Sequence, residues 1–276
     1  MKIVTWNVRG ICSSYKRYSM WKTVFISQWD VLCAVEHKEH ARSGSSLQYK
    51  QYHVFYAGVI GGLYSGIMLI IRDNLKPMVV QRDVHGRFLV VEVNYEGNKI
   101  WVVGIYAPNV AGQRINLWRA LHQVLRNGRP GFLLGDFNMC SEVGQSTSMH
   151  GVMDAPEREV WDLFMMEVLR YDTWTWINGH NVGYTFQSAQ YRQTWSRLDR
   201  IYIMHDETFL PALMTMKVYK GIGSSDHFPV VLESTHQIVD DFRSFLGKQP
   251  LWFNSSFLRH NNFKNARGQL VEEFTR

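Results

Sequence analysis

The sequence has 276 residues, and its 30 lysines and arginines against 24 aspartates and glutamates give a formal net charge of +6. Hydrophobic residues make up 46% and charged residues 20% of the chain, a balance that is typical of a globular protein and excludes a disordered chain, a collagen-like rod and a coiled coil. No window approaches the ~18 consecutive apolar residues of a transmembrane helix, so we expect no membrane partner.

The cysteines indicate a reducing environment. The three of them are odd in number, stand far apart and form no Cys-x-x-Cys pair, so we expect neither a disulfide framework nor a structural zinc site. Trp6 and Asn7 interrupt the first apolar run too early for a signal peptide. We therefore expect an intracellular protein.

Short runs rich in Val and Ile, bounded by Gly, Pro, Asn or Asp, predict strands along most of the chain. These strands span residues 2–7, 30–36, 53–57, 65–72, 86–94, 99–107, 131–136, 198–204 and 226–233, and residues 94–98 (Asn-Tyr-Glu-Gly-Asn) predict a hairpin turn. Helical spacing of apolar residues predicts helices at 18–28, 115–125 and 158–169. Hairpins mixed with helices favour two packed sheets with helices outside them.

The strand signals stop near residue 234. Asparagines and serines become frequent after that point, with one short helix expected at 265–274. We therefore expect a compact domain at residues 1–234 and a linker or tail at 235–276.

Polar residues that can bind metal or transfer protons fall at the predicted strand ends, where α/β scaffolds usually carry their sites. They are Asn7, Glu36, Tyr106, Asp136 with Asn138, Asp199, and the run Ser225-Asp226-His227. Each also fits an ordinary role when taken alone: Asn7 as a turn residue, Glu36 as part of a solvated charge run, and Tyr106 as a core aromatic.

The combination favours phosphodiester hydrolysis. A hard divalent cation needs oxygen ligands, which Glu36 and Asn7 supply together with water. Asp136 and Asn138 stand two apart on an extended segment and point to the same side, where Asp136 can orient or deprotonate a water while Asn138 holds an oxygen. His227 supplies an imidazole whose tautomer a nearby carboxylate such as Asp199 can fix.

Six motifs in order resemble those of the exonuclease–endonuclease–phosphatase superfamily over about residues 1–234. They are Thr5-Trp6-Asn7-Val8, Glu36 at its strand end, Tyr106-Ala107-Pro108-Asn109, Gly135-Asp136-Phe137-Asn138, Arg197-Leu198-Asp199-Arg200 and Ser225-Asp226-His227. The resemblance implies an α/β (α+β) fold, a four-layer α/β/β/α sandwich of two packed mixed sheets like that of DNase I. It also implies a phosphoesterase that depends on Mg²⁺, with Mn²⁺ as the alternative.

The resemblance assigns roles by position. Glu36 and Asn7 would bind the metal, with Asp226 completing the surroundings of the metal and the leaving group. Asp136 would handle the attacking water, and Asn138 and Tyr106 would contact the phosphate or the leaving group. Asp199 would orient His227. The chain departs from the family at Val35, where a Gln usually precedes the metal-binding Glu.

Two regions look like those of non-LTR (LINE-type) retrotransposon endonucleases. The short polar segment 189–195 is similar to their DNA-contacting hairpin, and residues 251–263 loosely resemble the segment that joins the endonuclease to the reverse transcriptase. The expected DNA contacts are Arg9, Thr185, Tyr191, Arg192, Arg197 and Ser225.

We therefore expect a monomeric nuclear endonuclease, linked to a reverse transcriptase domain, that nicks one strand of double-stranded DNA. The nick would leave a 3′-hydroxyl that primes reverse transcription. Two alternatives stay open: an abasic-site repair endonuclease, and a catalytically inactive nucleic-acid-binding module.

Overall fold

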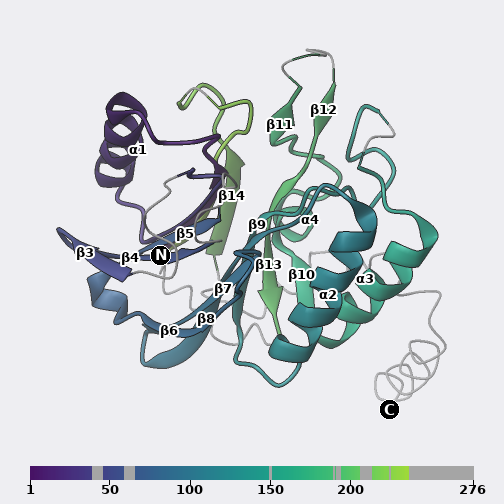
Figure 1. Cartoon of the computed structure of the whole chain (residues 1–276), viewed down its shortest axis with the longest axis horizontal. Coiled ribbons are helices and arrows are strands. Elements are labelled where there is room, and N and C mark those ends of the chain that lie inside the picture. The colour runs from purple at the N-terminus through teal and green to yellow at the C-terminus, as the bar shows by residue number, and fades with distance from the viewer. Residues whose placement is uncertain are drawn as a thin grey trace. The chain divides into compact units, whose positions relative to one another are not determined.

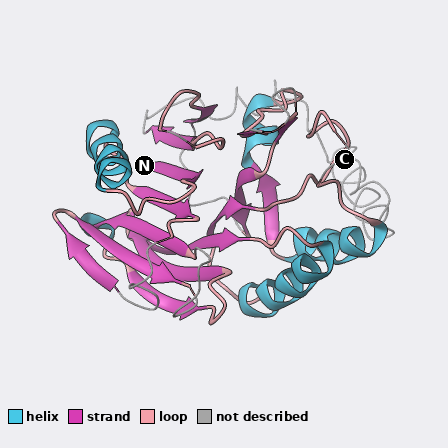
Figure 2. Ribbon diagram, turned by 45° about the horizontal axis from the view of Figure 1, so that its top comes forward, coloured by secondary structure: helices cyan, strands magenta, loops and turns pink. Residues whose placement is uncertain are grey.

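Two β-sheets pack face to face in the computed structural model, and helices lie on both outer sides (Figures 1 and 2). The structure describes residues 1–38, 46–58, 66–148, 151–188, 190, 194–205, 213–223 and 225–235. These residues belong to the compact unit Met1–Gln237. Within them, no helix has both the length and the apolar character needed to cross a bilayer.

The first sheet has the strand order β14-β15-β1-β2-β5-β4-β3. Its strands are β1 (Lys2–Asn7), β2 (Val31–Val35), β3 (Ser46–Tyr49), β4 (Tyr52–Ala57), β5 (Ile67–Arg72), β14 (Leu213–Val218) and β15 (Val230–Thr235). Strands β1 and β2 run parallel, and the other neighbours are antiparallel. The sheet is therefore mixed.

The second sheet has the order β10-β13-β9-β8-β7-β6. Its strands are β6 (Met78–Arg82), β7 (Phe88–Tyr95), β8 (Asn98–Tyr106), β9 (Gly131–Asp136), β10 (Leu169–Asp172) and β13 (Asp199–Met204). Only β8 and β9 run parallel among the neighbours in this sheet. Two short strands, β11 (Phe186–Gln187) and β12 (Trp195–Ser196), form a separate hairpin.

Apolar side chains of the two inner faces form the central core. Val35 and Leu69 from the first sheet belong to the same buried cluster as Leu89, Leu134 and Ile201 from the second. Burial of such side chains contributes about 1.5–3 kcal/mol each, which fixes the two sheets against one another.

Amphipathic helices cover the outer faces and complete four layers. Helix α1 (Ser14–Ser27) buries Met20 and Val24 in a cluster with side chains of the first sheet. Helices α2 (Ala111–Leu125) and α3 (Ala155–Glu167) bury Trp118 and Trp161 in a cluster with side chains of the second. The predicted four-layer sandwich of two mixed sheets is thereby confirmed.

Within the described residues every predicted strand and helix is present, with shifted bounds in places. The strand predicted at 226–233 begins at Val230, because the preceding residues form a loop. The helix predicted at 158–169 ends at Glu167, and Leu169 already begins β10. The turn at Glu96 and Gly97, which have φ angles of 54° and 83°, joins β7 and β8 as predicted. The tail 235–276 and its helix at 265–274 lie outside the described residues apart from Thr235.

Several elements were not predicted. They are β3, β6, β10, β11, β12, β14, the 3₁₀ turn Asp73–Leu75 and helix α4 (Thr173–Asn178). Strand β6 lies at an edge and has no fully buried residue, so it lacks the alternating apolar pattern that marks a strand.

Candidate active site

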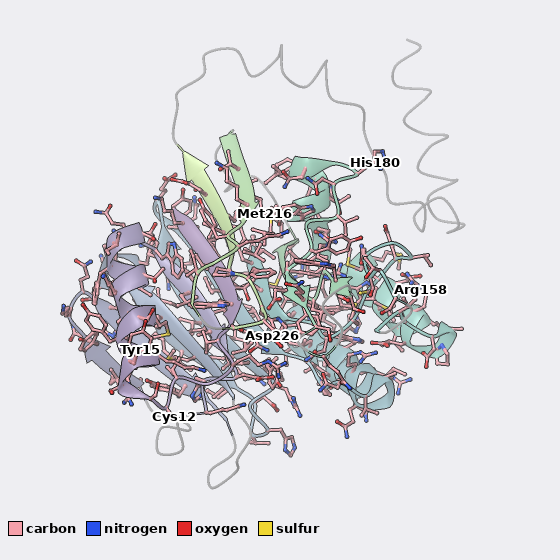
Figure 3. The ribbon with its side chains drawn as sticks, turned by 90° about the horizontal axis from the view of Figure 1, so that it is seen from above. Cys12, Tyr15, Arg158, His180, Met216 and Asp226 are labelled. Atoms are coloured by element: carbon pink, nitrogen blue, oxygen red, sulfur yellow. The ribbon has the colours of Figure 1, made fainter. Side chains whose placement is uncertain are left out.

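The predicted polar residues gather at one edge of the sandwich because of how the strands run. Strands β1 and β2 end at this edge, as do β8 and β9, since each pair is parallel. Strand β13 begins there because it is antiparallel to β9, with Asp199 opposite Asp136. Figure 3, which views the molecule from above, shows Asp226 in the middle of this face.

Asp136, the last residue of β9, is buried at the centre of the site. Its Oδ2 accepts a hydrogen bond from Asn7 Nδ2 at 3.0 Å, and its Oδ1 accepts one from the Asn138 backbone N–H at 2.9 Å. Burial, helped by the charge of Asp199, raises the pKa of Asp136 to about 6. The carboxylate is therefore both fixed in place and more basic than an ordinary Asp.

Gly135 allows β9 to approach β8 this closely. A Cβ at Gly135 would lie 1.9 Å from the backbone oxygen of Ile105. The glycine before Asp136 thus serves the strand pairing that places Asp136 opposite Tyr106.

Glu36 follows β2 and faces Tyr106 at the end of β8. The Tyr106 hydroxyl donates to Glu36 Oε1 at 2.8 Å. Burial and the Glu36 charge raise the pKa of Tyr106, so its hydroxyl stays protonated. Among the described residues, the cationic neighbours of Glu36 Oε2 are Lys38 Nζ at 3.9 Å and Arg9 NH1 at 4.0 Å.

His227 forms a buried pair with Asp199. Its Nδ1 lies 2.8 Å from Asp199 Oδ2, which also accepts a hydrogen bond from the Thr185 hydroxyl at 2.8 Å. Burial favours the neutral imidazole, but the negative charge and hydrogen bond of Asp199 and the charge of Asp136 outweigh it and raise the pKa of His227 to about 9. At neutral pH the site therefore presents an imidazolium.

Ser225 and Asp226 connect this loop to the first strand. The Ser225 hydroxyl donates to the backbone oxygen of Asn7 at 2.7 Å and accepts from the His227 backbone N–H at 3.1 Å. Asp226 accepts two hydrogen bonds from Arg9, Nε to Oδ1 at 2.7 Å and NH2 to Oδ2 at 2.5 Å. Arg9 and the His227 charge lower the pKa of Asp226, against the effect of burial.

Three residues of the site have left-handed backbone conformations. The φ angles are 48° at Arg9, 54° at Glu36 and 48° at Asn138. This region is uncommon for residues other than glycine and costs free energy. The chain turns sharply at each of these strand ends, which directs polar groups into the site.

The donor atoms fit a hard divalent cation. Glu36 Oε2 receives no hydrogen bond from the described residues, since its two cationic neighbours lie beyond hydrogen-bonding distance. Carboxylate and amide oxygens are the ligands such cations prefer. Glu36 and Asn7 are thus the residues that would hold a metal, whereas both oxygens of Asp226, the expected third ligand, accept hydrogen bonds from Arg9. Ligand atoms of Asp136, Asp199 and His227 also lie within 4.8 Å of one another.

The residues expected to contact DNA differ in their exposure and in their partners. Thr185 and Arg197 are buried, and Ser225 bonds within the site. The Arg197 guanidinium pairs with Asp172 instead of facing solvent, which disfavours the expected contact with a phosphate backbone. Arg9 is exposed but binds Asp226. Tyr191 and Arg192 lie outside the described residues.

Two residues have roles at the site that the sequence did not indicate, although Thr185 was expected as a DNA contact. Thr185 supports Asp199, and Lys38 stands beside Glu36. The position of Lys38, two residues after Glu36 in the sequence, is a signal that was available, whereas no local pattern marks Thr185.

The fold and the site define an enzyme of the phosphodiesterase and nuclease class. Residues 4–227 match the Endonuclease/Exonuclease/phosphatase family, and the chain belongs to that family. The resemblance seen in the six motifs is thereby confirmed. Enzymes of this family typically depend on a divalent metal.

Solved structures with the same fold include two AP endonucleases and a retrotransposon domain. The AP endonuclease from Archaeoglobus fulgidus has 19% identity and a TM-score of 0.66, over 85% of this chain and 99% of that one. The AP endonuclease LMAP from Leishmania major has 18% identity and a TM-score of 0.70, over 86% and 88%. The endonuclease domain of TRAS1, a telomere-specific non-LTR retrotransposon, has 15% identity and a TM-score of 0.61, over 86% and 99%. At these identities the likeness concerns the fold.

Proposed function

We propose that this protein is a metal-dependent DNA endonuclease that nicks one strand and leaves a 3′-hydroxyl. The proposal rests on three groups that lie together at one edge of the sandwich. They are the Asp136 carboxylate, which Asn7 and Asn138 hold in place, the His227–Asp199 pair and the Glu36 carboxylate. A single phosphodiester bound there could contact a base (Asp136), a cationic hydrogen-bond donor (His227) and a metal ion held by Glu36.

The residues divide the work of hydrolysis. Asp136 accepts a proton from a water whose oxygen attacks phosphorus in line, and the P–O3′ bond breaks as the new P–O bond forms. The O3′ leaving group takes up a proton and becomes the 3′-hydroxyl, while the phosphate stays on the 5′ side. The His227 imidazolium stabilises the charge that develops on the phosphate oxygens.

Other residues position the substrate and the metal. The Tyr106 hydroxyl, held protonated, and the Asn138 amide are placed to contact the phosphate or the leaving group. A divalent cation held by Glu36 and Asn7, Mg²⁺ in this proposal or Mn²⁺, would neutralise phosphate charge and polarise the bond that breaks.

The finer proposal is that the chain acts in retrotransposition. The TRAS1 domain shares the fold, and the expected similarities of segments 189–195 and 251–263 favour the same class. The nick would then prime reverse transcription by a linked reverse transcriptase domain, in the nucleus, on double-stranded DNA bound by a single copy of the domain. The net charge of +6 suits such a partner.

A second candidate function is repair of abasic sites, because two AP endonucleases have the same fold with TM-scores of 0.66 and 0.70. Two oligonucleotide duplexes, with and without one abasic site, distinguish the candidates. Similar cleavage of both duplexes supports the retrotransposon type, whereas strong preference for the lesion supports repair.

The proposal is tested by nicking of supercoiled plasmid in Mg²⁺ or Mn²⁺. Asp136→Ala, Glu36→Ala and His227→Ala should each lose activity by at least about a hundredfold, and EDTA should abolish wild-type activity. The matched control Glu233→Ala removes a carboxylate that pairs with Lys2 instead and should nick normally. Nicking that survives all three site variants would refute the assignment. DNA binding without nicking in any metal would favour the inactive binding module.

A further inference from the structure

Arg9 lies inside the acidic edge and joins the two carboxylates that face it. Its guanidinium uses Nε and NH2 for the two oxygens of Asp226, and its third nitrogen, NH1, lies 4.0 Å from Glu36 Oε2. The side chain of Asp226 is only 16% exposed and that of Arg9 is 43% exposed. The guanidinium therefore covers Asp226 while one of its sides faces solvent.

This pair differs from an ordinary surface ion pair of the same chain. Arg129 has a similar exposure of 49% and binds Glu92, which is 12% exposed, but through a single hydrogen bond, Nε to Oε2 at 2.9 Å. Arg9 holds both oxygens of Asp226 in the two-pronged geometry that is the most specific arrangement for a carboxylate. An Arg side chain stays protonated at every working pH, so the charge beside Asp226 is permanent.

The two acidic residues thus differ in what they can offer a metal. Both oxygens of Asp226 are engaged by Arg9, whereas Glu36 Oε2 has no hydrogen bond from the described residues. A cation that approached Asp226 would have to displace the guanidinium and would meet its positive charge at close range, which is unfavourable.

We infer that Arg9 is a built-in cation that keeps Asp226 out of the metal coordination, so that this centre takes one divalent cation through Glu36. Arg9 is therefore a positioning residue for Asp226, and its role deepens the proposed nuclease function and rests on it. In this inference Asp226 acts beside the metal instead of binding it, and the expectation that Arg9 contacts DNA stays a prediction.

The solvent-facing side of the guanidinium adds a consequence for substrate binding. Its charge is present before any metal binds, and it sits between the carboxylate that would hold the metal and the loop that carries His227. A phosphate entering the edge would therefore meet the charge of Arg9 in addition to the His227 imidazolium and the metal.

The test counts metal ions on the full chain without DNA. Mn²⁺ is titrated into the protein, and free Mn²⁺ is measured by electron paramagnetic resonance alongside calorimetry. The wild type should bind one Mn²⁺. Arg9→Met, which keeps the aliphatic stem and removes the guanidinium, should bind a second Mn²⁺ or bind the first at least about tenfold more tightly, because a like charge near the site is gone.

Companion variants separate this inference from a general loss of structure. Arg9→Met combined with Asp226→Asn should return to one weaker Mn²⁺, because the released carboxylate is gone. Asp226→Asn alone should still bind one Mn²⁺, whereas Glu36→Gln should bind none. The matched control Arg129→Met, at the pair with Glu92, should give the wild-type isotherm, and thermal unfolding confirms that each variant is folded.

Each remaining outcome contradicts the inference. Any of three results would overturn it: two Mn²⁺ ions in the wild type, loss of Mn²⁺ in Asp226→Asn, or an unchanged isotherm in Arg9→Met. If Arg9→Met does not fold, the number of Mn²⁺ ions bound by Asp226→Asn decides the matter. A wild type that binds one Mn²⁺ as described but never nicks DNA would refute the proposed function alone. Normal nicking with an unchanged Arg9→Met isotherm would refute the inference alone.

Discussion

Thr185→Val is the substitution that best distinguishes a supporting residue from a DNA contact. The Thr185 hydroxyl is buried, donates to Asp199 Oδ2 at 2.8 Å, and accepts from the backbone N–H groups of Leu198 at 3.1 Å and Asp199 at 3.0 Å. Valine has the same shape but no hydroxyl. The substitution therefore removes three hydrogen bonds without creating a cavity.

The expected cost follows from those bonds. A hydrogen bond to a charged group contributes about 1.5–3 kcal/mol, and each buried N–H left without a partner costs about 1–3 kcal/mol. Allowing for partial relaxation of the two N–H groups, we expect a loss of about 3–4 kcal/mol in the free energy of unfolding. For a unit of this size that lowers Tm by ~10 °C.

The kinetic effect separates the two roles. Asp199 Oδ2 also accepts from His227 Nδ1, so a carboxylate freed from Thr185 no longer fixes the imidazole. We expect kcat for plasmid nicking to fall at least about tenfold, while the Kd for the same DNA stays within about twofold.

The control is Thr5→Val. Thr5 is also buried on a strand, but its hydroxyl has no hydrogen-bond partner in the described part of the chain, so its replacement should be neutral or stabilising. The reasoning would be refuted if Thr185→Val kept the wild-type Tm and kcat and instead bound DNA more weakly, as a direct contact requires.

Three further substitutions test the scaffold. Burial tends to raise the pKa of Asp172, but two arginine charges hold it below the ordinary value. The ionised carboxylate therefore contributes to the stability of the fold above about pH 4, and this contribution is lost as pH falls. Asp172→Asn should accordingly show a shallower fall in Tm between about pH 5 and pH 3. Glu157→Gln leaves the buried Arg114, bound at 2.6 Å in the wild type, without its counter-charge. The free energy of unfolding, measured by chemical denaturation, should fall by about 3–5 kcal/mol, and replacing both residues with Met should restore much of it. Gly135→Ala places a Cβ 1.9 Å from the Ile105 oxygen and should cost about 4 kcal/mol or more; a wild-type Tm would show that β8 and β9 can separate freely.

Much of the site was predictable because it stands where strong strand signals end. The strand at Gly131–Asp136 was predicted with its observed bounds, since a run that is buried on both faces is apolar throughout. Parallel pairing brings Asn7 and Glu36 to one end of the first sheet, and Tyr106 and Asp136 to one end of the second. The packing of the two sheets then places these ends side by side. Short sequence patterns were thus enough to predict where these polar groups lie.

The partners of those groups were not predictable in the same way. Thr185, Ser225 and Arg197 look like surface polar residues in the sequence, yet tertiary contacts bury or engage each of them. Arg197 becomes internal only because Asp172, 25 residues earlier, lies beside it. Such pairings depend on the packing of distant elements, which no short motif records.

The site lies between the two sheets and takes residues from both, so its geometry depends on how the core packs the sheets together. Asn7 of the first sheet bonds Asp136 of the second at 3.0 Å, and Tyr106 of the second bonds Glu36 beside the first at 2.8 Å. His227, which precedes β15 of the first sheet, bonds Asp199 of the second at 2.8 Å.

Each of these three bonds joins groups carried by different sheets, so neither sheet holds a complete site. The distances among them are set by the apolar side chains between the sheets, which pack at the density of a crystal and transmit small shifts. A change of one methylene in that layer would move Asp136 relative to Glu36 and His227 together. The core of this fold therefore acts on catalysis through geometry, and the residues that set the reaction rate extend beyond those that touch the phosphate.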